Sequence, residues 1–283
     1  MPLQTWIIGC GDIGRRVAAL YGDQIIHGVV RSQNSVDSCQ QSNINASQID
    51  LDTSYTLPLE QFDNANVFYF APPPPTGQND PRLEVFLNAA GNLPKRIVLI
   101  STTGVYGDSK GEWIDENTPI NPKADRAHRR VSAEQLLQSW ANNHNKEFMI
   151  LRVPGIYAQD RLPLSRLKKG LAVVNENEAG WTNRIHADDL AQACKAAMEC
   201  KKTNQVINIT DGNPSSMTDY FNHVADYAKL PRPPQISMTE AEATLSEGMV
   251  SYLKESRRIK NDKMLEELKI KLKYPALDSL KGL

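Results

Sequence analysis

The chain has 283 residues, 40% hydrophobic and 23% charged, and its formal net charge is −1. This length allows a sizeable core, and the near-neutral balance gives no basic footprint for nucleic acid or an anionic membrane, so we expect neither as a partner. We find no signal-peptide pattern and no run of ~20 apolar residues. The four cysteines lack metal-type spacing and are too few for a disulfide framework, so we expect a cytoplasmic protein.

The stretch Thr5–Arg16 changes from an apolar run into a glycine-rich turn and then into the start of a helix. Gly9 permits the turn, Gly11 leaves room for a pyrophosphate, and Gly14 lets the helix pack closely on the strand. Free N–H groups and the helix dipole favour phosphate at such a helix start. The residues predicted to bind the cofactor here are Gly9, Gly11, Asp12, Ile13 and Gly14.

A second β-like run, Gln24–Val30, is followed directly by Arg31 and Ser32. At this distance from the glycine turn an NAD site has a carboxylate that binds the ribose. The fixed charge of Arg31 suits a 2′-phosphate instead, so NADP is favoured over NAD, although NAD stays open. The alternative is a solvated arginine at a strand end. Arg31 and Ser32 are therefore predicted cofactor-binding residues.

Four further strands are predicted, at Gln48–Leu51, Asn66–Ala71, Arg96–Ile100 and Phe148–Val153. Helical patterns at Pro81–Ala90 and Ala124–Asn142 alternate with them, which is typical of a parallel sheet covered on both faces. The prolines at Pro72–Pro75 must form a stiff loop at the carboxyl edge of the strands, where such sheets bind ligands. We predict a three-layer α/β/α, Rossmann-type doubly wound parallel sheet over residues 1–155.

Beyond residue 155 the pattern changes to shorter segments, including helices near Leu164–Gly170 and Ala187–Cys200. Residues 156–283 are predicted to form a smaller mixed substrate-binding region rather than an independent domain. His186 with Asp188 and Asp189 lacks the i, i+4 spacing of a zinc helix, so no metal is predicted. One of these two aspartates is expected to cap the helix that follows.

The sequence resembles the extended short-chain dehydrogenases/reductases, also called the NAD-dependent epimerase/dehydratase family. The motifs that carry the resemblance occur in the family's order: GCGDIG, Asp50-Leu51, STTGVYG, Asp115-Glu116 with Pro119 and Pro122, LRVPGIY and RIHADDLA. The resemblance implies that Asp50 and Leu51 flank the adenine. It also implies that Ala71 and Pro72 line the nicotinamide side and that Thr102 is the catalytic Ser/Thr. Short-chain reductases often dimerise, which leaves a homodimer open.

The chain departs from this family at the catalytic pair. Members carry Tyr-x-x-x-Lys followed four residues later by a Glu, and anchoring on Glu134 puts Arg130 at the Lys position and Arg126 at the Tyr position. An arginine does not give up its proton near neutral pH, so Arg126 cannot replace the Tyr as an acid. Arg130 can still donate hydrogen bonds to the nicotinamide ribose and is a predicted cofactor-binding residue.

We therefore predict an atypical NAD(P)-dependent oxidoreductase, NADP-preferring, that acts on a small molecule through another proton donor. Tyr106 is the favoured donor because it follows the Thr102 turn at the sheet edge, so Thr102 and Tyr106 are the predicted catalytic residues. Tyr157 and His128 are the other candidates. The alternative for Tyr106 is a packed aromatic, and for His128 a surface histidine.

Two other functions stay open at this point. The first is a dinucleotide-binding regulatory or redox-sensing protein without hydride chemistry, because the glycine turn is intact beside a missing Tyr/Lys pair. The second is a nucleotide-sugar epimerase or dehydratase, in which Arg152, Arg161 and Arg184 clamp phosphates. A structural ion pair is the alternative for each of these arginines, and it is the preferred interpretation for Arg152 at the end of a buried strand.

Overall fold

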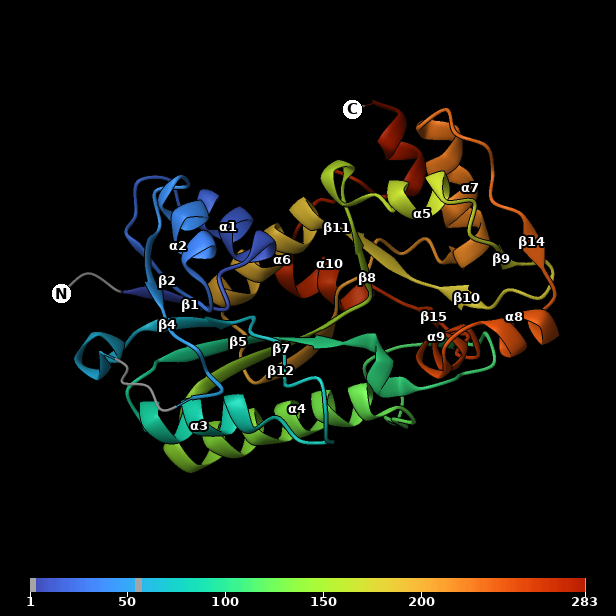
Figure 1. The fold of residues 1–283 in the computed structure, drawn as a ribbon. Coiled ribbons are helices and arrows are strands. Elements are labelled where there is room, and N and C mark those ends of the chain that lie inside the picture. The colour runs from blue at the N-terminus through green and yellow to red at the C-terminus, as the bar shows by residue number, and fades with distance from the viewer. Residues whose placement is uncertain (1–3, 54–57, 283) are drawn as a thin grey trace.

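The computed structural model describes residues 4–53 and 58–282. Within them, the centre of the molecule is a seven-stranded sheet in the order β12-β7-β5-β4-β1-β2-β3, with every neighbouring pair parallel (Figure 1). This confirms the predicted Rossmann-type sheet. The strands are β1 (Thr5–Ile8), β2 (Ile26–Val30), β3 (Asn45–Gln48), β4 (Asn66–Tyr69), β5 (Arg96–Thr102), β7 (Glu147–Val153) and β12 (Gln205–Asn208).

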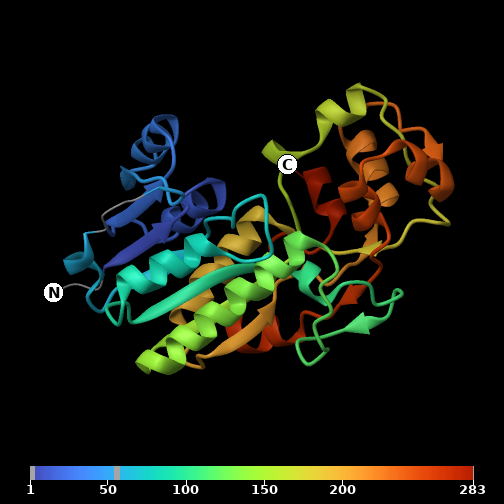
Figure 2. The same ribbon diagram turned by 60° about the horizontal axis from the view of Figure 1, so that its bottom comes forward.

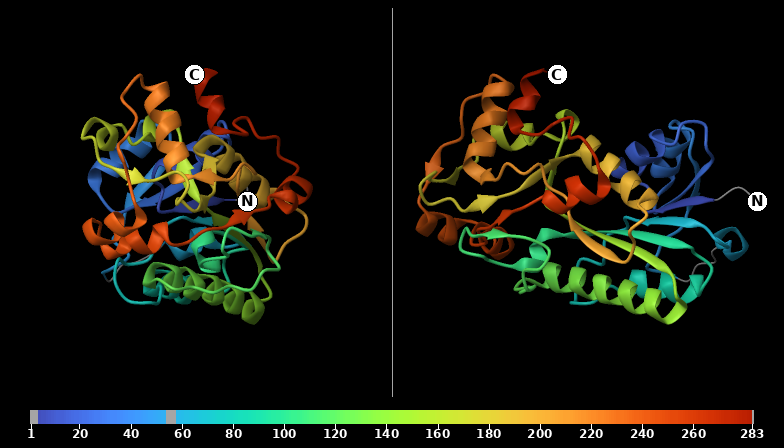
Figure 3. Two further views of the ribbon diagram at one scale, coloured as in Figure 1. Left: turned by 90° about the vertical axis from the view of Figure 1, so that its right-hand side faces the viewer. Right: turned by 180° about the vertical axis from the view of Figure 1, so that it is seen from behind.

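Helices cover both faces of this sheet, as the prediction of three layers requires (Figures 1 and 3). One face packs against α1 (Asp12–Ala19), α2 (Gln33–Gln40), α6 (Ala187–Glu199) and α10 (Asp262–Leu268). The other face packs against α3 (Pro81–Ala90) and α4 (Asp125–His144). Side chains of β1 alternate between the two cores, with Ile7 in the first and Trp6 and Ile8 in the second. Its unbroken apolar run is thus explained by burial on both sides.

The third strand lies three residues earlier than predicted. We expected Gln48–Leu51, but β3 pairs Asn45–Gln48 with His27–Val30. The reason is a turn at Asp50, whose carboxylate accepts a hydrogen bond from the Asp52 N–H (3.1 Å) and whose carbonyl accepts one from the Thr53 N–H (3.2 Å). An aspartate that bonds the backbone two residues on favours a turn over a strand.

The remaining elements gather beyond the carboxyl ends of the strands, at the end of the molecule away from the N-terminus (Figures 2 and 3). Their helices are α5 (Leu164–Lys168), α7 (Met217–Tyr227), α8 (Met238–Thr244) and α9 (Glu247–Leu253), and their 3-10 turns are η2 (Thr103–Tyr106), η3 (Gln159–Arg161) and η4 (Leu277–Gly282). Four two-stranded ladders join them: β6 (Trp113–Ile114) with β15 (Arg258–Ile259), β8 (Gly155–Tyr157) with β11 (Arg184–His186), β9 (Val173–Val174) with β14 (Gln235–Ile236), and β10 (Trp181–Thr182) with β13 (Ser215–Ser216). A further 3-10 turn, η1 (Leu59–Phe62), lies instead before β4.

The residues predicted for the smaller C-terminal region are divided between two places. Strand β12 and helices α6 and α10 belong to the central sheet and its covering layer, while α5, α7, α8 and α9 lie in the C-terminal group. The boundary at residue 155 stays a prediction. Of the helices in the described part of the chain, none combines the length and the apolar character needed to cross a bilayer.

Candidate functional site

The turn between β1 and α1 has the geometry that a phosphate-binding glycine motif requires. Gly9 has a φ of +83°, and a Cβ there would lie 2.4 Å from the Ala71 backbone nitrogen. A Cβ on Gly14 would lie 3.0 Å from Ile7 Cγ2, so this position keeps the helix close to the strand. A Cβ on Gly11 would meet no described atom within 4 Å. The open space therefore lies at the helix N-terminus, where a pyrophosphate fits.

Asp12 and Arg16, in the first turns of α1, take part in an ion-pair network that reaches the C-terminal elements. Asp12 pairs with Arg16 at 3.0 Å and with Arg161 at 2.8 Å, and Arg16 also pairs with Asp160 and Asp188. Burial alone would raise the pKa of Asp12, but the hydrogen bonds from Arg161 and Arg16 hold it below its usual range. Asp12 is therefore a carboxylate whose charge is already neutralised beside the predicted phosphate site.

A cavity of about 240 Å³ lies at the carboxyl ends of β1, β2 and β4 and brings together six of the predicted cofactor residues. Both pairs that the resemblance assigns to different ends of the cofactor, Asp50-Leu51 and Ala71-Pro72, border this one cavity. Ser32 lies next to it as the N-cap of α2. The lining residues are Gly9, Val29, Val30, Arg31, Ile49, Asp50, Leu51, Ala71, Pro72 and Arg82.

The charged groups at the rim of this cavity are two arginines and two aspartates. Arg31 is 69% exposed and pairs with Asp50 at 3.3 Å and more loosely with Asp52 at 3.8 Å. Arg82 donates to Asp52 at 2.6 Å and to the Pro72 carbonyl at 2.7 Å, and its hydrogen bond lowers the pKa of Asp52. Sequence reasoning missed Arg82, which reaches the rim from α3, the helix that follows β4.

A second cavity, of about 410 Å³, lies where β5 and β7 end and is lined by Arg126 and Arg130, the residues predicted to occupy the Tyr and Lys positions. Thr102 borders it, and its Oγ1 accepts a hydrogen bond from the Gly104 N–H at 3.2 Å, which leaves the O–H group as a donor. We call it the Thr102 cavity. Its lining residues are Thr102, Thr103, Gly104, Arg126, Ala127, Arg130, Pro154, Gly155, Trp181, Thr182, Asn183, Tyr252, Glu255 and Arg257.

The two arginines of α4 in this cavity are held in different ways. Arg130 donates to the Ile100 carbonyl at 3.2 Å, and burial lowers its pKa although Asp80 partly offsets this. Arg126 donates to Ser251 Oγ at 2.8 Å, and its Nη2 lies 3.6 Å from a Glu255 carboxylate oxygen. That Nη2 is buried and forms no hydrogen bond with the described residues. Both arginines thus carry positive charge into the cavity from one helix face.

Tyr106, Tyr157 and His128, the predicted proton donors, lie outside the described lining of the Thr102 cavity. Tyr106 is 2% exposed, donates to Asn208 Oδ1 at 2.9 Å, and burial raises its pKa. Tyr157 is 1% exposed, and burial raises its pKa as well. His128 is half-buried on α4. The packed-aromatic alternative describes Tyr106 better than the catalytic one does.

The three arginines considered as phosphate clamps all have partners inside the chain. Arg152 forms a buried bidentate pair with Glu134, at 3.0 and 2.7 Å, which confirms the predicted ion pair. Arg161 pairs with Asp12. Arg184 is 4% exposed and donates to Ser215 Oγ at 2.8 Å. Arg152 and Arg184 are therefore buried structural arginines, while Arg161 has one ionic partner and a side chain that is 37% exposed.

The predicted cap of α6 is wrong. The N-cap residue is His186, whose ring accepts a hydrogen bond from the Asp188 N–H at 3.2 Å. Asp188 instead pairs with Arg16, and Asp189 accepts hydrogen bonds from the Lys273 and Tyr274 N–H groups. Long-range partners therefore compete successfully for both aspartates. Within the described residues, no group of three or more His, Cys, Asp or Glu side chains is placed to bind a metal.

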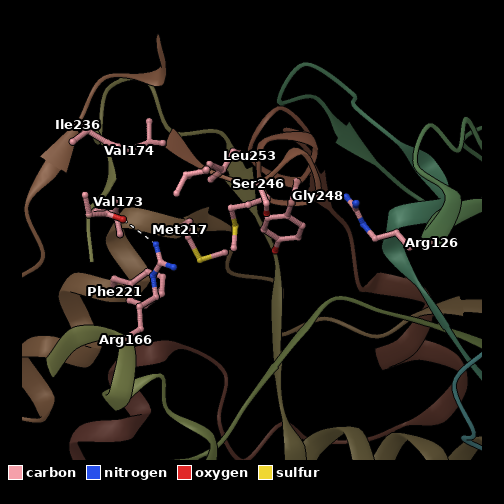
Figure 4. Close-up of a pocket in the computed structure, with 14 residues that line it drawn as sticks. Arg126, Arg166, Val173, Val174, Met217, Phe221, Ile236, Ser246, Gly248 and Leu253 are labelled. Carbon is pink, nitrogen blue, oxygen red and sulfur yellow. Dashed lines mark hydrogen bonds between the residues drawn. The ribbon is translucent and has the colours of Figure 1, made fainter. Parts of the chain in front are cut away.

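A third cavity, of about 520 Å³, adjoins the Thr102 cavity and is almost wholly apolar (Figure 4). The two cavities share Arg126 and Tyr252. We call it the apolar cavity. Sequence reasoning missed it, because its walls come from α5, α7, β9, β14 and α9, which are short and far apart in the chain. Its lining residues are Arg126, Arg166, Ala172, Val173, Val174, Met217, Phe221, Ile236, Leu245, Ser246, Gly248, Met249, Tyr252 and Leu253.

Comparison with known proteins gives one family. Residues 83–210 match the model described as the NAD dependent epimerase/dehydratase family. Protein YeeZ of Escherichia coli strain K12 is 26% identical over 218 residues, which cover 72% of this chain and 76% of YeeZ. Three other curated relatives are matched over less than half of their own length.

Solved structures resemble the chain over nearly its whole length. A functionally unknown conserved protein from Silicibacter pomeroyi is 28% identical, with a TM-score of 0.85 and coverage of 99% of this chain and 98% of that one. The UDP-glucuronic acid 4-epimerase from Bacillus cereus, solved in complex with NAD, is 17% identical, with a TM-score of 0.78 and coverage of 99% and 96%. The second likeness establishes the fold.

Proposed function

We propose that the chain, whose residues 83–210 match the NAD dependent epimerase/dehydratase family model, is an NAD(P)-binding oxidoreductase that acts on a small molecule. The observation that carries the proposal is the open space at Gly11, between Gly9 and Gly14. A side chain at Gly9 would clash with the Ala71 backbone, and one at Gly14 would press on Ile7, so both positions require glycine. The cavity lined by Arg31 and Leu51 continues from this turn and is suited to the adenosine end of a dinucleotide.

The Thr102 cavity is the proposed place of reaction. A bound nicotinamide would supply or accept a hydride there. The Thr102 hydroxyl can donate a hydrogen bond to a substrate oxygen, and Arg130 can donate to ribose or substrate oxygens but cannot lose a proton. Tyr252 lines this cavity, and its phenol is the proposed proton donor in place of the family's Tyr. No spacing in the sequence could have indicated Tyr252, since it comes from α9.

We propose NADP as the preferred cofactor. The end of β2 has Arg31 where an NAD site has a carboxylate, and its side chain is 69% exposed at the cavity rim. Its present partners, Asp50 and Asp52, hold it at the rim without burying it. A 2′-phosphate would compete with them for the guanidinium.

A pair of glycine variants tests the binding site. Gly11→Ala adds a methyl group to open space, so we expect an unchanged melting temperature and an affinity for NADP lowered about 10-fold or more, as expected when a pyrophosphate contact of roughly 1.4 kcal/mol is lost. Gly14→Ala is the matched control, because it presses on Ile7 and Cys10 and should lower the melting temperature first. Calorimetric titration and thermal unfolding measure both. If Gly11→Ala binds NADP as tightly as the unmodified chain does, the open space at Gly11 is not the pyrophosphate site.

A nucleotide-sugar epimerase or dehydratase is the second candidate. It is favoured by the likeness to the UDP-glucuronic acid 4-epimerase from Bacillus cereus. The burial and internal partners of Arg152 and Arg184 disfavour it, because these two arginines are not free to hold a diphosphate. Incubation with UDP-sugars and NAD, followed by chromatography, distinguishes it: a change of sugar configuration supports the second candidate.

A further inference from the structure

The apolar cavity is not used by the proposed function, and it has the composition of a binding site for an apolar group. It is walled by aliphatic, aromatic and methionine side chains, and its described lining contains no acidic residue. Its two charged residues are both arginines, Arg126 and Arg166 (Figure 4). A site of this kind takes a ligand that is largely apolar and carries any charge as an anion.

The two arginines occupy different parts of the cavity. Arg166 lies beside Val173 and Phe221, where its guanidinium stacks on the Phe221 ring at 5.3 Å and donates to the Ala172 carbonyl at 2.9 Å. It is thus part of the wall. Arg126 lies away from Arg166 in Figure 4 and also borders the Thr102 cavity. Arg126 therefore stands where a ligand would pass from one cavity into the other.

The charge at this junction favours an anion. The lining of the Thr102 cavity carries three arginines, Arg126, Arg130 and Arg257, against one carboxylate, Glu255. Arg257 already pairs with Glu255 at 2.8 Å, while Arg126 is 3.6 Å from the other oxygen of that carboxylate. The Arg126 side chain is 40% exposed and its Nη2 forms no hydrogen bond with the described residues, so this guanidinium keeps donor capacity that a ligand at the junction can use.

We infer that the substrate is a carboxylic acid with an apolar side chain and a carbonyl or hydroxyl group near the carboxylate. The apolar chain occupies the apolar cavity, the carboxylate binds Arg126 at the junction, and the reacting oxygen lies at Thr102. A guanidinium can bind a carboxylate through two parallel hydrogen bonds. This inference rests on the proposed function, because it takes the Thr102 cavity as the place of reaction.

The test is ligand binding without turnover, on the full chain saturated with NADP⁺, which cannot reduce an oxo acid. The probes are pyruvate, 2-oxohexanoate and 2-oxooctanoate, with 2-octanone as the uncharged analogue. About 0.8 kcal/mol for each buried methylene is about fourfold in affinity. We therefore expect calorimetry to show 2-oxooctanoate binding at least 100-fold more tightly than pyruvate, and at least 10-fold more tightly than 2-octanone.

Two variants assign these effects to the two parts of the site. Met249→Asp places a carboxylate in the apolar cavity at a side chain that is 38% exposed, so the fold should persist. It should weaken 2-oxooctanoate at least 10-fold and leave pyruvate unchanged. Leu265→Asp, at a 40% exposed position of α10 outside both cavities, is the matched control and should change neither. Arg126→Gln should remove the preference for the acid over 2-octanone.

The outcomes separate this inference from the proposed function. If NADP⁺ binds but affinity does not rise with chain length, or Met249→Asp has no effect, the inference is overturned and the proposed function stands. If NADP⁺ does not bind, the series is repeated without it. A retained length dependence then supports the apolar site while the proposed function fails, and a flat series overturns both.

Discussion

The glycine turn and the Thr102 cavity differ in how they are assembled. The turn belongs to a motif of six consecutive residues, 9–14, that runs from the end of β1 into α1, and close approaches to Ala71 and Ile7 fix it. The Thr102 cavity takes Thr102 from β5, Arg126 and Arg130 from α4, and Tyr252 from α9. A site made from one short segment can be recognised from its residue spacing. A site made from distant segments has no such spacing, because only the fold brings its residues together. The glycine turn could therefore be predicted from the sequence, whereas the arrangement of the Thr102 cavity could not.

The largest expected effect comes from Tyr252→Phe, which tests whether Tyr252 is the proton donor of the Thr102 cavity. Tyr252→Phe should lower the turnover rate by about 10²–10⁴-fold, which is the usual contribution of a positioned acid or base, and leave NADP affinity unchanged. Steady-state kinetics with the best substrate found measures it. Tyr106→Phe is the comparison, because Tyr106 lies outside the described lining. If Tyr106→Phe is the variant that stops turnover, the assignment of Tyr252 is wrong.

The buried ion pair between Arg152 and Glu134 is the next test, which measures how much this arginine contributes to stability. Arg152→Met leaves Glu134, which is 3% exposed, without its ionic partner, and we expect the free energy of unfolding to fall by about 3–5 kcal/mol. Urea denaturation measures this. Arg232→Met breaks a pair whose arginine is 61% exposed, and it should change stability little. Equal effects of the two variants would contradict a structural role for Arg152.

The smallest expected effect concerns the rim of the adenosine cavity. Arg31→Ala should lower the affinity for NADP about 10-fold, the value of one charge-assisted hydrogen bond, and leave NAD affinity unchanged. Because both cofactors are titrated into the same variant, NAD serves as the internal control. Tighter binding of NAD than of NADP by the unmodified chain would show that the proposed NADP preference is wrong.

The sequence predicted the fold closely where local chemistry decides it. Helix α3 has the predicted bounds, because Asp80 caps it and Pro81 occupies its first turn. The third strand was misplaced because the turn at Asp50 depends on one side-chain hydrogen bond. Of the candidate site, six lining residues of the adenosine cavity were predicted from motifs, while Arg82 and Tyr252 could not be, since only the fold brings them to the cavities.

Tyr106 shows why the direction of a side chain is harder to predict than its position along the chain. It follows Thr102 at the sheet edge as expected, but the turn η2 directs its ring inward to Asn208 of β12, a strand 102 residues away. Arg152 then packs over the ring at 4.8 Å and completes the burial. The position along the chain was right, and the direction of the side chain depended on partners that no local pattern contains.

Transfer of deuterium from C4 of labelled NADPH is the most direct test of whether the bound dinucleotide reacts. The chain is incubated with a panel of 2-oxo acids, other carbonyl compounds, thioesters and sugar nucleotides, and the products are analysed by mass spectrometry. We predict deuterium on the carbinol carbon of at least one product, with a proton added to its oxygen. NADPH that binds tightly but leaves every compound in the panel unlabelled would contradict the account and favour a dinucleotide-binding regulatory protein.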